Sequence, residues 1–155
     1  MKRHLAFIPL SREHQDGLIL ATRLQQGRKA LLRLWSHDLN WQAEYVVKFY
    51  DDSLSTHFDV EEKLVFPLAQ IYFGEKAKIV QRLYEEHSSM KSMVESFPRP
   101  NQKILGENLT NFGKLLEAHI HCEERDFFPF CEKIIPEEKL NELGSKIKQF
   151  KDGKR

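Results

Sequence analysis

The chain has 155 residues, which is the length of one domain with a substantial core. With 41% hydrophobic and 30% charged residues, its composition is that of a globular protein and excludes a disordered or fibrous chain. Lys and Arg number 24 against 23 Asp and Glu, so no overall charge attracts nucleic acid or a membrane surface. No apolar run reaches the roughly 18 residues of a membrane span, and the apolar stretch at the N-terminus is too short for a signal peptide. We expect one domain over residues 1–155, located in the cytoplasm.

The N-terminal third predicts an arm, a helix and a loop. Residues 1–10 read as an irregular or extended arm, and Ser11 suits the N-cap of a first helix. The apolar surface of this helix continues through Leu31 and Trp35, and residues 36–40 read as a loop.

Two further helices follow in the middle of the chain. Helical spacing of apolar residues predicts one helix from about Trp41 past Pro67, where proline is expected to kink it. Gly74 is expected to end that helix, and the next one runs from about Glu75 to Phe97.

The last third predicts a long helix and a short one. Residues 98–101 are a clear break, and a helix runs from about Gln102 to beyond Phe130. Strand signals are absent, and connections are short. The pattern therefore predicts an all-α, up-down-up-down four-helix bundle over about 11–134, with a short fifth helix over about 137–150.

An eleven-residue stretch occurs twice, at 57–67 and at 119–129. Each copy reads His, three residues, Glu-Glu, a basic residue, three residues that end in Phe, and then Pro. Residues four apart share one face of a helix. Each copy therefore presents an imidazole beside a carboxylate, and the two pairs are His57 with Glu61 and His119 with Glu123.

Each repeat has a single histidine upstream of it, in the dipeptides Glu13-His14 and Glu86-His87. Folding the chain at Gly74 brings His87 level with the first pair, within about one helical turn. His14 and the second pair lie toward the same end of the bundle, although a loop or a tilt must correct the register of the third and fourth helices. Six side chains then meet in one core: His14, His57, Glu61, His87, His119 and Glu123.

Such a cluster is expected to bind metal. Burying two carboxylates and four imidazoles in an apolar core is costly unless these groups are paired or coordinate a cation. Two cations, bridged by the two glutamates and each completed by two histidines, would solve this. Mixed imidazole and carboxylate ligation suits iron, manganese or zinc, and it leaves positions open for an added ligand.

The order His, His-x-x-x-Glu, His, His-x-x-x-Glu, with its Glu-Glu and Phe-Pro, resembles the hemerythrin-like family of HHE cation-binding domains. The resemblance covers about residues 10–132. It implies a non-haem di-iron centre in a four-helix bundle, held by His14, His57, Glu61, His87, His119 and Glu123.

The chain departs from the oxygen carriers of that family at two places. Those proteins have a second histidine four residues after the third-helix histidine, where this chain has Lys91. They also end the motif with Asp at the fifth position after His, whereas Glu123 and Glu124 follow His119 here. The site is more similar to members with four His and two Glu, which include iron-sulfur repair proteins and iron or oxygen sensors. The repair proteins also carry a cysteine-bearing N-terminal segment, and residues 1–10 contain no cysteine.

Three functions remain open. The first, which we favour over an enzyme, is a binding protein. Its two irons take up dioxygen, nitric oxide or a related small ligand for sensing, storage or detoxification. The second is a redox or repair protein that turns over peroxide or nitric oxide, or donates iron to damaged clusters. The third is a structural bundle with a vestigial site. The oligomeric state is left open.

Several nearby residues are expected to lie outside the ligand set. His121 is two residues beyond His119 and faces away, while Glu62 and Glu124 are rotated by about 140° from the repeat histidines and would lie beside the metals or at the surface. Lys91 would either reach the site or extend to water. The cysteines Cys122 and Cys131, nine residues apart on one helix, are about 13 Å apart and cannot form a disulfide.

Overall fold

A computed structural model describes residues 2–30, 33–99 and 101–154, and every regular element in this part of the chain is helical. The α-helices are α1 (Ile8–Gln26), α2 (Leu39–Phe49), α3 (Ser55–Val60), α4 (Phe66–Phe73), α5 (Lys78–Ser96), α6 (Gln102–Cys122), α7 (Phe128–Ile134) and α8 (Glu137–Gly153).

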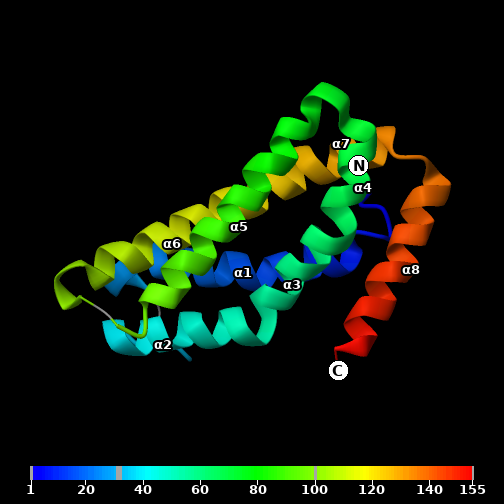
Figure 1. Cartoon of the computed structure of the whole chain (residues 1–155). Coiled ribbons are helices and arrows are strands. Elements are labelled where there is room, and N and C mark those ends of the chain that lie inside the picture. The colour runs from blue at the N-terminus through cyan, green and yellow to red at the C-terminus, as the bar shows by residue number, and fades with distance from the viewer. Residues whose placement is uncertain (1, 31–32, 100, 155) are drawn as a thin grey trace.

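These helices form four legs and one added helix. The legs are α1, then α2 to α4, then α5, then α6 with α7, and α1 packs along α6 (Figure 1). Helix α8 packs against α3 and the turn that follows it. The predicted all-α four-helix bundle with a C-terminal fifth helix is confirmed.

The first helix begins earlier and ends earlier than predicted. It starts at Ile8, and Pro9 occupies its first turn, where the missing N–H is tolerated. Ser11 is therefore not the N-cap, and its hydroxyl instead donates to Glu124 of the neighbouring fourth leg. Gly27, with φ of 57°, ends the helix because a left-handed conformation suits glycine.

The predicted continuation of the first helix to Trp35 is wrong, because α1 is followed by a single 3-10 turn over Gly27–Lys29. Trp35 lies outside any helix and packs edge-on against the Trp41 ring at 5.3 Å. Leu31 and Leu32 lie outside the described residues, as does Pro100 in the predicted break. Asp38 caps α2 by accepting a hydrogen bond from the Asn40 N–H.

Wide π-helical turns interrupt the second and fourth legs. They span Tyr50–Leu54, Glu61–Val65 and Glu123–Phe127. The last two lie directly before Phe66-Pro67 and Phe128-Pro129, where a proline ring would clash with the carbonyl four residues back in an ordinary helix. Figure 1 shows the main change of direction in the second leg between α2 and α3, at the first π turn.

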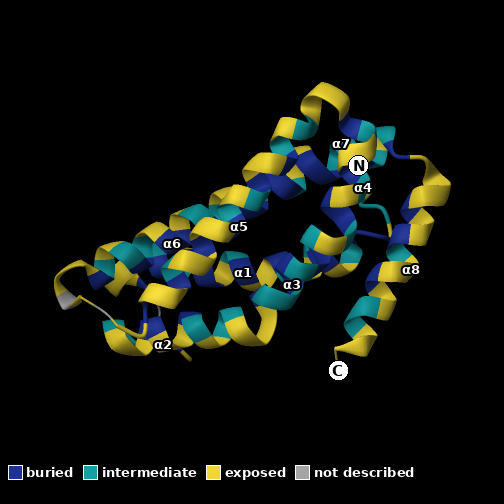
Figure 2. Cartoon of the chain, viewed as in Figure 1, coloured by how far each residue is buried: buried dark blue, intermediate teal, exposed yellow. Residues whose placement is uncertain are grey.

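The predicted stop at Gly74 is confirmed, with φ of 57°, and α5 begins at Lys78 after one 3-10 turn. The apolar faces of the helices turn inward, as the dark blue residues of Figure 2 show. They form two clusters, one around Phe66, Phe127 and Phe128 and the other around Phe58 and Phe112. The buried His and Glu side chains come from all four legs.

Candidate metal centre

All six sequence-predicted ligand residues are buried together. His14 lies on α1, His57 on α3, His87 on α5 and His119 on α6, and each is at most 4% exposed. Glu61 and Glu123 are both 0% exposed and open the second and third π turns. The structure therefore places one histidine from every leg, and both repeat glutamates, at one level of the bundle.

The six side chains form two overlapping groups of four. Within each group, one nitrogen or oxygen atom per residue lies within 4.8 Å of the others. The first set is His14, His57, Glu61 and Glu123, and the second set is His87, His119 and the same two glutamates. Both carboxylates thus belong to both sets.

The distances show how each glutamate spans the two sets. Glu61 Oε1 lies 3.2 Å from His57 Nε2 and 3.4 Å from His87 Nε2. Glu123 Oε1 lies 3.2 Å from His14 Nε2 and 3.2 Å from His119 Nε2. A cation held by either set would therefore lie within reach of both carboxylates.

Four further glutamates hold the outer nitrogen of each imidazole. The Nδ1 atoms lie 2.9 to 3.0 Å from these carboxylate oxygens. The pairs are His14 with Glu124, His57 with Glu13, His87 with Glu62, and His119 with Glu86. A carboxylate accepts the Nδ1–H, so every Nε2 is directed at the centre, which is how metal-bound histidines are usually oriented.

This arrangement fits a pair of cations. With Nδ1–H donated outward, a neutral imidazole has a lone pair at Nε2, and the His14 and His57 Nε2 atoms lie only 3.1 Å apart. His87 and His119 repeat this contact at 3.1 Å. Both oxygens of Glu61 and of Glu123 are buried and accept no hydrogen bond from the described residues. A cation in each set would bind these lone pairs and neutralise the carboxylates.

A family model for the hemerythrin HHE cation-binding domain matches residues 9–131. The chain belongs to this family. Three uncharacterised proteins, one from Mycobacterium bovis and two from strains of Mycobacterium tuberculosis, are each 30% identical to this hemerythrin-like chain over 97 residues. The aligned segment covers 61% of this chain and 58% of each relative.

The hemerythrin-like centre is pseudo-symmetric down to its outer carboxylates. His57 pairs with Glu13 of its own half of the chain, as His119 pairs with Glu86 of its own half. Glu62 and Glu124, predicted to lie outside the ligand set, belong to neither group of four, whereas the sequence analysis predicted no role for Glu13 and Glu86. Their only signal is that each one directly precedes a histidine.

The remaining sequence candidates belong to neither set. Lys91 is exposed, so its extension to water is the alternative that holds, and His121 is partly exposed. Cys122 and Cys131 are buried free thiols, as their spacing predicted. None of the described helices combines the length and the apolar character that crossing a membrane requires.

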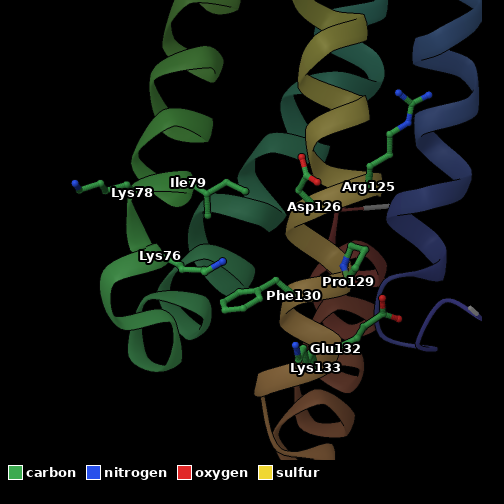
Figure 3. Close-up of a pocket in the computed structure, with 9 residues that line it drawn as sticks. All are labelled: Lys76, Lys78, Ile79, Arg125, Asp126, Pro129, Phe130, Glu132 and Lys133. Carbon is green, nitrogen blue, oxygen red and sulfur yellow. The ribbon is translucent and has the colours of Figure 1, made fainter.

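A surface groove lies outside the buried centre, between the start of α5 and α7 (Figure 3). Its volume is about 790 Å³, and its apolar floor includes Ile79 and Phe130. Figure 3 shows Lys78 and Arg125 pointing away from each other, so these polar groups do not converge on a common ligand position.

Without metal, the central groups share protons. Burial and the neighbouring Glu123 carboxylate raise the pKa of Glu61 to about 8. Burial alone would lower the pKa of His119, but the carboxylates of Glu123 and Glu86 raise it to about 10. The pKa of Glu124 is lowered although burial opposes this, because His14 and Ser11 donate to its carboxylate.

These shifts predict that the metal-free protein loses stability as the pH rises. Glu61 and His119 hold protons in the folded state that the unfolded chain has already released. Folding stability therefore falls as the pH rises, until each group has also lost its proton in the folded state, at about pH 8 for Glu61 and about pH 10 for His119. Between pH 6.5 and pH 9 we expect the unfolding temperature of the metal-free protein to fall by on the order of 10 °C.

Thermal unfolding of chelator-treated protein checks this expectation. Metal-loaded protein is the control, since metal competes with protons for the same ligands and binds more tightly as the pH rises. An unfolding temperature of the metal-free protein that rises over this range would contradict the expected protonation.

Proposed function

We propose that this hemerythrin-like chain holds two iron ions and binds a small ligand such as dioxygen or nitric oxide, for sensing, storage or detoxification. The observation that carries the proposal is the pair of four-residue sets that share Glu61 and Glu123, with every Nδ1 held by an outer carboxylate. We place the protein in the cytoplasm, where two free cysteines remain reduced.

The donor set favours iron over a structural zinc ion. Each cation would receive two imidazoles and two shared carboxylates, and iron with such ligands retains open positions. Structural zinc sites prefer thiolates and are closed. Manganese or zinc would also fit the nitrogen and oxygen donors. When loaded, two irons supply open coordination positions and reversible one-electron chemistry.

A small cavity lies beside the first set, and His14 and His57 form part of its wall. It has a volume of about 20 Å³ and is lined by residues that include His14, His57, Gly17, Leu54 and Ile120. A cavity of this size holds about one water-sized molecule. It therefore leaves room for one small ligand beside the first set.

The two halves of the centre differ in the size of the apolar side chains that lie beside them. In the first half, the cavity is lined by Gly17, three residues after His14, and by Ile120, which directly follows His119. In the second half, the Phe58 ring stacks on His87 with centroids 3.7 Å apart and meets the edge of His119 at 5.7 Å. Phe58 thereby covers the second set, and this supports binding of the ligand at the first.

Spectroscopic titration of iron-loaded protein tests the proposal. Nitric oxide, added without air, is expected to change the absorption spectrum and to saturate at one equivalent per chain, and dioxygen to change the spectrum of the reduced protein. Two irons per chain with no spectral response to nitric oxide, dioxygen or azide would rule out a ligand-binding centre.

Filling the cavity should block the ligand without removing metal. In Gly17→Ala the new Cβ would lie 2.9 Å from Ile120 Cδ1, and both of these residues line the small cavity. We expect azide affinity to fall by about tenfold or more, as forcing atoms into filled space costs about 1–3 kcal/mol. Isothermal titration with azide measures the loss. Gly106→Ala, in α6 beside Leu39, is the matched control that should keep wild-type affinity.

The two alternative functions predict different results. A redox or repair protein would consume many equivalents of peroxide or nitric oxide per chain, or transfer its iron to a damaged cluster, whereas the proposed binding protein saturates. A structural bundle with a vestigial site would show the same metal content in wild-type protein and in His57→Ala.

A further inference from the structure

Helix α8 lies outside the matched family region, which ends at residue 131, yet it reaches the metal centre. Its apolar residues Leu140, Leu143 and Ile147 are buried in the same cluster as Val60 of α3. Near its C-terminal end, Lys151 extends to α1 and lies 2.6 Å from Glu13 Oε1. The added helix thus contacts an outer carboxylate of the centre.

One oxygen atom of Glu13 serves two partners. Oε1 lies 2.6 Å from the Lys151 ammonium and 3.0 Å from Nδ1 of His57. The glutamate side chain is 40% exposed, and that of Lys151 is 20% exposed. A carboxylate at this exposure has alternative rotamers in water, so a cation that fixes Oε1 also fixes the hydrogen bond that orients His57.

The equivalent carboxylate of the second half is held differently. Glu86, which orients His119, is paired with Arg82 one turn earlier on its own helix, at 3.2 Å. The first half therefore depends on a helix outside the bundle, whereas the second half depends on its own helix. This difference makes the two halves separable by mutation.

We propose that Lys151 is a positioning residue for the first set, acting through Glu13 to hold the His57 imidazole in its metal-binding orientation. The inference rests on the proposed metal centre. Removing the ammonium should weaken metal binding at the first set and leave the second set as it is.

The test uses full-length protein loaded with zinc, which is diamagnetic. Lys151→Met keeps the aliphatic stem and removes the charge, whereas Lys151→Arg keeps the charge. In Lys151→Met we expect one of the two zinc ions to leave about two- to fivefold faster into excess chelator, the effect of a partly exposed ion pair. Lys151→Arg should restore the slower rate, and Lys148→Met, an exposed lysine of the same helix, should match wild type.

Proton and nitrogen NMR distinguishes the proposed role of Lys151 from a general loss of stability, because it observes each histidine separately. The Nδ1–H signal of His57 should shift or exchange faster in Lys151→Met, while that of His119 stays unchanged. Arg82→Met should produce the reverse pattern.

Each failure has its own signature. Wild-type protein that takes up two zinc ions, with Lys151→Met identical to it in release rate and in the His57 signal, would overturn this inference alone. Equal effects on His57 and His119 in Lys151→Met would also overturn it. Wild-type protein that takes up no zinc, iron or manganese would overturn the metal centre and this inference with it.

Discussion

Replacing either shared glutamate is expected to abolish the dinuclear centre. In Glu61→Ala or Glu123→Ala, both sets of four lose a ligand, because each carboxylate belongs to both. We expect the iron content to fall from about two per chain to one or less. Elemental analysis together with protein concentration measures this directly.

The shared position predicts a contrast with the histidines. His57→Ala removes a ligand from the first set only, so the second iron should remain. Glu44→Ala, at an exposed position in the same leg, should keep both irons. Full occupancy by two irons in Glu61→Ala would refute its bridging role.

Loss of folding should not obscure this result. The Glu61 carboxylate is completely buried, and neither of its oxygens accepts a hydrogen bond from the described residues. Without metal such a group destabilises the fold, as its raised pKa of about 8 indicates. Metal-free Glu61→Ala is therefore expected to unfold at or above the wild-type temperature at pH 8, which shows that the loss of iron is local.

The second large effect is expected at Phe58. This ring is 3% exposed, stacks on His87 and joins the hydrophobic cluster that includes Phe112. Phe58→Ala should lower the free energy of unfolding of the metal-free protein by about 3–5 kcal/mol, the usual cost of deleting a buried phenylalanine ring. Chemical denaturation measures this loss, and Phe58→Leu, which keeps most of the volume, should lose less.

The same change tests why the two halves of the centre differ. With the ring removed, the second set gains space beside His87 and His119. We expect iron-loaded Phe58→Ala to bind a second azide per chain. A stoichiometry that remains at one would show that Phe58 does not control access to the second set.

The helical fold and the cluster of six residues follow from periodicity. His57 with Glu61 and His119 with Glu123 share helix faces because they are four residues apart, and the duplication places both pairs in the same register. Short connections then make neighbouring legs antiparallel. These are local rules, and the structure follows them at this level of the bundle.

The outer carboxylates could not be predicted from the same rules. Glu124 holds His14 from another helix, and Glu62 holds His87 in the same way, so helix packing decides both contacts. Rotation by about 140° directs each of these glutamates away from its own histidine and toward a neighbouring helix.

The start of the first helix and the π turns were missed for different physical reasons. Ser11 resembled an N-cap, but Pro9 is already compatible with a first turn, and burial of Phe7 and Leu10 draws the preceding residues into the core. The π turns before Pro67 and Pro129 relieve a clash of the proline ring with the preceding turn, which the spacing of apolar residues does not reveal. The contact between Lys151 and Glu13 was also not predicted, because it depends on how α8 packs against the bundle.

The most direct test of the account is the metal content of protein purified without chelators and then supplied with iron in the absence of air. We predict about two irons per chain, and about one in His57→Ala. Protein that contains no metal and also refuses added iron would contradict the account, and the six buried side chains would then be an unusually polar core.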